Sequence, residues 1–318
     1  MKRLGRAAWF PALLVPALLA TACAPTMPEQ PRTYTRDWSY VRGALSPFWW
    51  YDLVDVKTAR TKNATGAGRS VAVVDTGIEV DDPDVPGAQG VATCGSNPSS
   101  IADQNGHGTQ LTGIAAGRDP GQVTQGVAPG ATRVVIKIDC GVVTADSLTR
   151  GIDAAIQRNP DVVLLALGGY PAGAPDVNAF LESRIRARPA ILFVIASVWD
   201  GTRYPFPAWT RLPNAVVVAA MTPTDDKKAE VPYNTKLGDL WAPGREVQTA
   251  SVGYAAAYSM QGTSAASAIV AGCAALLKQK QPAASGAELK TRLVATAEPK
   301  PQLPAPNNRR LNCGQAVP

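Results

Sequence analysis

The stretch Val71-Ala72-Val73-Val74-Asp75-Thr76-Gly77 is an unbroken apolar run that ends in a carboxylate and a turn residue. Continuous β-branched runs of this kind are typical of a strand that is buried on both faces of a parallel sheet. Open α/β sheets place their functional groups just beyond the carboxyl ends of such strands. Asp75 is therefore a candidate functional residue.

Similar apolar runs alternate along the chain with stretches that predict helices. The predicted strands are Val71 to Val74, Arg133 to Ile138, Val162 to Leu167, Ile191 to Ala196 and Ala215 to Ala220. One predicted helix begins after Gly108, and four others span Asp146 to Arg158, Val177 to Ala187, Ser264 to Lys280 and Gly286 to Thr296. This alternation predicts an α/β fold with a doubly wound, mainly parallel sheet and helices on both faces.

The chain contains one histidine, His107, in the segment Asn105-Gly106-His107-Gly108-Thr109. Ser264, whose side chain carries a hydroxyl group, lies far downstream in Gly262-Thr263-Ser264-Ala265-Ala266, where a glycine turn leads into a predicted helix. A serine hydroxyl attacks an amide only with a base within hydrogen-bond reach, and that base needs a group that orients it. Ser264, His107 and Asp75 supply these three chemical types.

Seven segments, in order, resemble the subtilisin-like serine proteases, or subtilases, and the likeness runs from about residue 49 to residue 297. They comprise the three segments above with Gly126-Val127-Ala128-Pro129-Gly130, Leu165-Ala166-Leu167-Gly168-Gly169, Tyr204-Pro205 and Trp241-Ala242-Pro243-Gly244; Gly66-Ala67-Gly68 before the first strand also matches. The resemblance implies that Asp75, His107 and Ser264 form a catalytic triad. It also implies that Leu167, Gly168 and Gly169 bind the substrate peptide as an added strand.

One departure from the family concerns the oxyanion site. Subtilases usually supply one oxyanion donor from an Asn side chain, where this chain reads Ala196-Ser197-Val198-Trp199-Asp200-Gly201. A protonated Asp200 could replace that donor, whereas an ionised Asp200 would repel the oxyanion. The alternative is that Asp200 is only a turn residue, which leaves the backbone N–H of Ser264 as the remaining donor.

The N-terminus predicts export. Residues 1–22 combine a basic start, an apolar stretch too short for a membrane span and a small-residue cleavage site. Cys23 then resembles the lipidated residue of a bacterial lipobox, although ordinary signal-peptidase cleavage after Ala22 is also compatible. We expect an export signal at 1–22, a tether at 23–47, a peptidase domain at 48–298 and a C-terminal tail at 299–318.

The cysteines agree with an exported protein. Five cysteines without Cys23 leave four, which predicts two disulfides. Three pairings are possible, and we favour Cys94 with Cys140 and Cys273 with Cys313. No zinc site is expected, because no pair of cysteines has zinc-ligand spacing and the single histidine already has a role.

Charge and composition narrow the possible partners and cofactors. The formal net charge of +6 falls to +3 once Lys2, Arg3 and Arg6 leave with the signal, too little to argue for a nucleic-acid partner. We expect a monomer without a cofactor, held at a membrane only by a lipid anchor. The acidic run Glu79, Asp81, Asp82 and Asp84 leaves calcium binding open, with a solvated loop as the alternative.

The sequence thus predicts an exported serine endopeptidase that acts on polypeptides, located on the outer face of a bacterial membrane or secreted. The alternative is a weak or inactive subtilase-fold protein that captures peptides, because the usual oxyanion Asn is missing. The size, the export signal and the predicted disulfides also give some likeness to the mycosin branch. Mycosins typically end in a membrane helix, and no second apolar span of that kind is present here.

Overall fold

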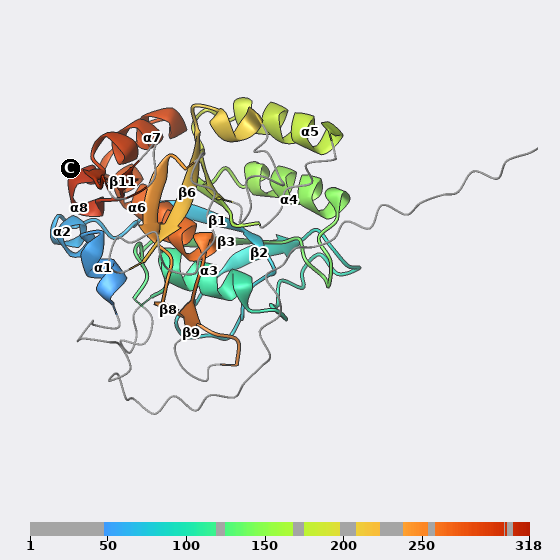
Figure 1. Ribbon diagram of the computed structural model, residues 1–318. Coiled ribbons are helices and arrows are strands. Elements are labelled where there is room, and N and C mark those ends of the chain that lie inside the picture. The colour runs from blue at the N-terminus through green and yellow to red at the C-terminus, as the bar shows by residue number, and fades with distance from the viewer. Residues whose placement is uncertain are drawn as a thin grey trace, which may run out of the picture.

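The computed structural model describes residues 48–118, 125–167, 175–197, 208–222, 238–253, 258–301, 303 and 308–318 (Figure 1). The described strands form one large sheet in the order β10-β11-β7-β6-β5-β4-β1-β3-β2. Their bounds are β1 Ser70–Asp75, β2 Gln89–Ala92, β3 Thr132–Lys137, β4 Val162–Leu165, β5 Leu192–Ala196, β6 Ala215–Met221, β7 Leu240–Pro243, β10 Glu298–Pro299 and β11 Arg309–Arg310. Every neighbouring pair is parallel except β10 with β11.

Helices cover both faces of this sheet, so the doubly wound α/β arrangement is confirmed (Figure 1). Val71 and Val73 of β1 pack on the face of α3 (His107–Ala116) and α6 (Thr263–Lys280), whereas Ala72 and Val74 pack toward α4 (Ala145–Gln157) and α5 (Pro175–Arg186). The helix α7 (Gly286–Ala295) lies on the α6 face, and a 3-10 helix, Ala208–Arg211, lies near α5. Successive side chains of a strand point to opposite faces, which is why apolar runs without alternation predicted strands buried on both sides.

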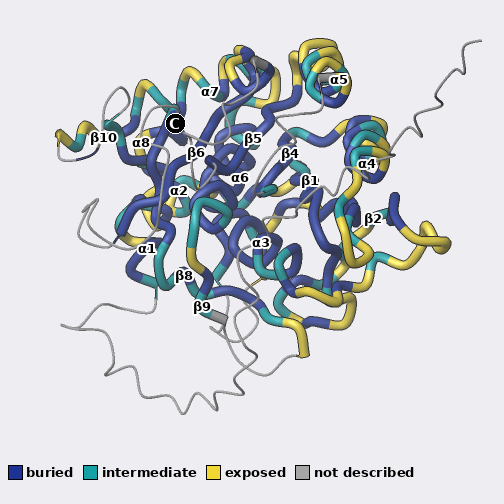
Figure 2. The backbone as a smooth tube through the Cα atoms, turned by 45° about the vertical axis from the view of Figure 1, so that its right-hand side comes forward, coloured by how far each residue is buried: buried dark blue, intermediate teal, exposed yellow. Residues whose placement is uncertain are grey.

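The helix α6 runs through the centre of the molecule (Figure 2). All of its residues from Ala265 to Lys278 are buried, which is the pattern of a helix enclosed on every side. It approaches α3 closely at Gly272, where a Cβ atom would lie 2.6 Å from the carbonyl oxygen of Ala115. Because only glycine fits at that distance, this contact sets how near the two helices lie. Within the described residues, no helix combines the length and the apolarity that a membrane crossing needs.

A small antiparallel hairpin of β8 (Val247–Thr249) and β9 (Tyr258–Met260) lies beside α3. The Thr249 hydroxyl donates to the carbonyl oxygen of Gln110 in α3, at 2.5 Å. The hairpin leads directly into α6, so it joins the helix that begins at His107 to the one that begins at Thr263.

The described parts of the C-terminal segment, where the sequence predicts a tail at 299–318, pack on the rest of the fold. Glu298–Pro299 and Arg309–Arg310 add β10 and β11 to the sheet, and α8 (Cys313–Ala316) packs on α2 (Val56–Thr61), near α1 (Trp49–Leu53). The Lys62 ammonium donates to the carbonyl oxygens of Gly314 and Val317. The Pro- and Asn-rich composition before β11 gave no indication that the short apolar C-terminal segment is buried. Its burial depends on its contact with α2 and α6.

Both disulfides have the pairing favoured from the sequence. Cys94 is bonded to Cys140 across the loops that follow β2 and β3, and Cys273 of α6 is bonded to Cys313 at the start of α8. The second bond is fully buried and holds the C-terminal segment on the central helix.

Replacing both cysteines of either pair with alanine is expected to lower the free energy of unfolding by about 2–5 kcal/mol. The physical reason is that the bonds close loops of 40 and 46 residues, whose unfolded forms gain entropy when the link is removed. Urea unfolding under oxidising conditions measures the change, with reduced wild-type protein as the control. A double variant that unfolds at the midpoint of the oxidised wild type would contradict the expectation.

Candidate active site

Asp75 ends β1 at the carboxyl edge of the sheet and is almost completely buried, with 2% of its surface exposed. Its Oδ1 atom accepts hydrogen bonds from the His107 ring at Nδ1, 2.7 Å away, and from the backbone N–H of Thr76 at 2.8 Å. An ionised carboxylate only accepts hydrogen bonds, so this contact places the imidazole proton on Nδ1. The second ring nitrogen of a neutral His107 is then free to take a proton.

His107 is the first residue of α3 and follows Gly106, whose φ of 97° lies in the left-handed region that favours glycine. The next residue, Gly108, touches the loop after β1: its N–H donates to the Thr76 hydroxyl, and a Cβ atom would lie 2.3 Å from the carbonyl oxygen of Gly77. The two glycines around His107 are thus required by a turn and by a close backbone approach.

A residue that sequence reasoning did not single out, Asp103, also acts on this loop. Its carboxylate accepts hydrogen bonds from the backbone N–H groups of Asn105, Gly106 and Thr109, and from the Thr109 hydroxyl. An acidic residue just ahead of a helix start is a recognised capping signal, so the pattern Asp103-Gln104-Asn105-Gly106 could have indicated this role.

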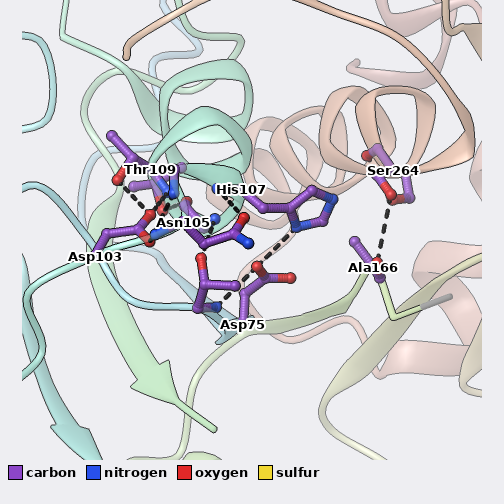
Figure 3. Close-up of polar contacts among 12 residues, drawn as sticks. Asp75, Asp103, Asn105, His107, Thr109, Ala166 and Ser264 are labelled. Carbon is purple, nitrogen blue, oxygen red and sulfur yellow. Dashed lines mark hydrogen bonds and ion pairs between the residues drawn. The ribbon is translucent and has the colours of Figure 1, made fainter. Parts of the chain in front are cut away.

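Ser264 is the second residue of α6 and is half-buried. Its hydroxyl donates to the carbonyl oxygen of Ala166, just after β4, at 3.4 Å, and no hydrogen bond joins it to His107 in the described part of the chain. Figure 3 shows His107 extending from α3 toward the side of the site where Ser264 lies. The backbone N–H of Ser264 belongs to the first turn of α6, where N–H groups have no partner within the helix.

The start of α6 is tied to the sheet by Thr263, whose hydroxyl donates to the carbonyl oxygen of Ser197 at 2.7 Å. Ser197 comes directly after β5. Because Ser264 follows Thr263, this bond and the contact with Ala166 fix the serine against the ends of two neighbouring strands, β4 and β5.

The electrostatic surroundings raise the pKa of His107 above its ordinary value. Burial of the ring lowers this pKa, but the charge and hydrogen bond of Asp75, together with the charge of Asp103, outweigh that effect. About a third of the His107 side chain, 32%, stays exposed, so the ring remains accessible to solvent. The pKa of Asp103 is lowered despite its burial, because four hydrogen bonds favour its ionised form.

Several predicted residues lie outside the described part of the chain, namely Gly168, Gly169, Asp200 and the lipidation candidate Cys23. Leu167 is described: it is half-buried and follows Ala166, the residue whose carbonyl oxygen Ser264 contacts. The described residues contain no group of three or more His, Cys, Asp or Glu side chains placed to hold a metal ion. In the acidic run, Asp82 is buried and its Oδ1 accepts the N–H of Asp84.

The model of the subtilase family matches residues 66–314. Subtilisin Savinase of Lederbergia lenta is 34% identical over 259 residues, which cover 80% of this chain and 92% of that protein.

Two solved mycosin structures share the fold. The structure of MycP1 with its N-terminal propeptide removed has a TM-score of 0.68 and 22% identity, covering 85% of this chain and 96% of MycP1. The structure of MycP3 protease, from a type VII secretion system, has a TM-score of 0.69 and 22% identity, covering 87% and 89%. The family model matches most of the chain, and the subtilisin relative covers 80% of it. The chain belongs to the subtilase family of serine peptidases.

Proposed function

We propose that this protein is an exported serine endopeptidase in which Ser264 is the nucleophile, His107 the general base and Asp75 the residue that orients His107. The observation that carries the proposal is the 2.7 Å contact between Asp75 Oδ1 and His107 Nδ1, made by a carboxylate that is buried at the end of β1. This contact selects the tautomer whose Nε2 atom accepts a proton. It also stabilises the imidazolium that forms during the reaction.

In the proposed reaction, Ser264 Oγ attacks the carbonyl carbon of the scissile peptide bond while its proton passes to His107 Nε2. His107 then gives that proton to the leaving amine nitrogen, the C–N bond breaks, and an acyl-enzyme ester remains on Ser264. A water molecule activated by His107 hydrolyses the ester and regenerates the serine. The hydroxyl rotates from the carbonyl oxygen of Ala166 toward His107, a change that apo sites commonly need.

The oxyanion of the intermediate is held by the backbone N–H of Ser264, at the positive end of the α6 dipole. The usual Asn donor is absent from the sequence between Ala196 and Gly201. Loss of one such donor from a subtilase slows turnover by about 10²–10³-fold, which leaves a slower enzyme rather than an inactive one. A protonated Asp200 is the candidate replacement donor.

The proposed substrate is an extended polypeptide that binds as a strand along Leu167, Gly168 and Gly169. The position of Leu167 favours this, because it follows Ala166, which contacts Ser264. We further propose that the enzyme works as a monomer without a cofactor. Residues 1–22 direct its export, and Cys23 carries a lipid anchor.

A second candidate function is peptide capture without cleavage. Two observations favour it: the oxyanion Asn is missing, and the Ser264 hydroxyl donates to Ala166 rather than to His107. The buried Asp75–His107 pair argues for the enzyme, because a protein that only binds peptides has no use for an oriented base.

An activated Ser264 should react covalently with a fluorophosphonate probe, since the base removes the hydroxyl proton as the phosphorus is attacked. Labelling of the exported chain is measured by fluorescence after denaturing gel electrophoresis. Both Ser264→Ala and His107→Ala are expected to abolish it. Ser267→Ala is the matched control, because that hydroxyl lies one turn further along α6, is fully buried, and bonds back to the carbonyl oxygen of Ser264.

Two results separate the candidate functions. A folded, disulfide-bonded protein that stays unlabelled contradicts the enzyme and leaves peptide capture, which isothermal titration with a peptide library would then measure. Labelling that persists in Ser264→Ala assigns the reaction to another side chain and removes the proposed mechanism.

The rate of labelling should fall at acid pH with a midpoint above about 6.5, the ordinary value for histidine. The sign follows from the raised pKa of His107: the base must be neutral, and a higher pKa keeps it protonated up to a higher pH. Labelling reactions quenched after fixed times across pH 5 to 9 measure the midpoint. A rate independent of pH over this range would contradict His107 as the base.

Lipidation at Cys23 predicts incorporation of an alkyne-tagged fatty acid by bacterial cells that express the full chain. Cys23→Ser should lose the tag and release the protein into the soluble fraction, because no second attachment site is proposed. A tag retained in Cys23→Ser, or absent from the wild type, would contradict the anchor.

A further inference from the structure

The loop before His107 is organised around one buried carboxylate, Asp103, of which only 6% is exposed. One oxygen, Oδ1, accepts the N–H groups of Asn105 and Gly106 at 3.0 and 2.8 Å. The other, Oδ2, accepts the N–H of Thr109 at 3.0 Å and its hydroxyl at 2.7 Å. Asp103 therefore binds the loop on one side of His107 and the first turn of α3 on the other side.

Asp103 is itself tied to the loop that follows Asp75. Its backbone N–H donates to the carbonyl oxygen of Ile78 at 2.9 Å, and Ile78 donates in turn to Ile101. The Thr109 hydroxyl, while it donates to Asp103, accepts the N–H of Glu79 at 2.9 Å. These bonds join the loop after β1 to the loop before α3, so the position of His107 relative to Asp75 depends on them.

Among the described residues, the elements packed on α3 carry few charged side chains. The elements packed on α3 are β1, β3, β8 and α6. They present Asp75 at the end of β1, Arg133 and Lys137 on β3, no charged side chain on β8, and none on α6 before Lys278. Arg133 donates to the carbonyl oxygen of Ala116 at the far end of α3, and Lys137 donates to that of Ala102, next to Asp103.

We propose that Asp103 is a positioning residue for His107. The carboxylate of Asp103 holds the imidazole of His107 toward Asp75 and adds a second negative charge near the ring. Asp103 touches neither substrate nor reacting atoms and acts through His107 alone. The inference rests on the proposed function only for its effect on the reaction rate; the effect on His107 itself is independent of catalysis. Of the described carboxylates, Asp75 and Asp103 are the two whose charges act on the ring.

The test uses the single histidine of the chain, because His107 then gives the only histidine signals in a ¹⁵N spectrum. The full exported chain, labelled with ¹⁵N-histidine, carries Ser264→Ala so that no self-cleavage occurs. The pKa and the tautomer of His107 are measured with and without Asp103→Asn. Removal of a negative charge should lower the pKa, on the order of half a unit, and should increase the Nε2–H tautomer.

The control is Thr109→Val, which keeps the size of the side chain and removes the two hydroxyl bonds, to Asp103 and to the N–H of Glu79. It keeps the charge of Asp103 and the three bonds of Asp103 to backbone N–H groups. It should leave the pKa of His107 within about 0.2 units of the parent, well inside the drop expected for Asp103→Asn. Asp103→Ser is the second variant, because serine also accepts N–H groups at a helix start but carries no charge. Asp103→Ser should show the same drop in the pKa of His107, and it provides the test if Asp103→Asn fails to fold.

The outcomes are distinct. A parent-like pKa and tautomer in the folded Asp103 variants overturn the proposal, and so does an equal drop of the pKa in Thr109→Val, since the charge would then not be its cause. A lower pKa in the Asp103 variants alone supports it. With Ser264 restored, the acid midpoint of probe labelling should move to lower pH by the same amount. A protein that shows the His107 shift but takes up no probe would refute the proposed enzyme and leave the role of Asp103 standing.

Discussion

The close contact between α3 and α6 is the constraint on which the site depends. His107 begins one helix and Ser264 lies at the start of the other, and neither segment is near the other in the sequence. Gly272 lets the two backbones approach until a Cβ atom there would collide with Ala115. Close packing of this kind transmits small displacements, so a shift of α6 would change the distance between Ser264 and His107.

The sheet supplies Asp75, the third residue of the proposed site, and buries it. Asp75 is buried because β1 lies between β3 and β4 and is covered on both faces. A carboxylate in such a place needs partners, and it finds them in Thr76 and His107. The hydrogen bonds of Asp103 and Thr109 then hold the loop that brings His107 to this partner. The arrangement is built from backbone contacts of two loops as much as from the three side chains themselves.

The family membership of the chain and its departure from the family concern different parts of the site. The Asp75–His107 pair has the geometry of an oriented base, which the proposed acyl transfer requires. The oxyanion segment lacks the usual Asn, and the serine hydroxyl is turned toward Ala166. Proton transfer and charge stabilisation contribute separately to the rate, so an oriented imidazole and the missing Asn are compatible with the slow peptidase proposed above.

The main elements of the fold were predictable from the sequence, because parallel strands buried on both faces are apolar without interruption. The five predicted strands and the long helices agree with the structure to within two residues. The strands β2, β7, β10 and β11, the hairpin strands β8 and β9, and the short helices α1, α2 and α8 were not predicted. They are too short to show a period, and their burial depends on neighbours that are remote in the sequence.

The same division applies to the site. The sequence by itself determined which chemical groups are available: one imidazole between glycines, a carboxylate after a strand and a hydroxyl before a helix. Only the tertiary structure decided that Asp75 meets the Nδ1 side of His107, that Asp103 binds both sides of the His107 loop, and that Ser264 contacts Ala166. The physical reason is that these contacts are hydrogen bonds between separate loops, and their geometry is set by the packing of the sheet and of α3 against α6, which no local pattern of residues records.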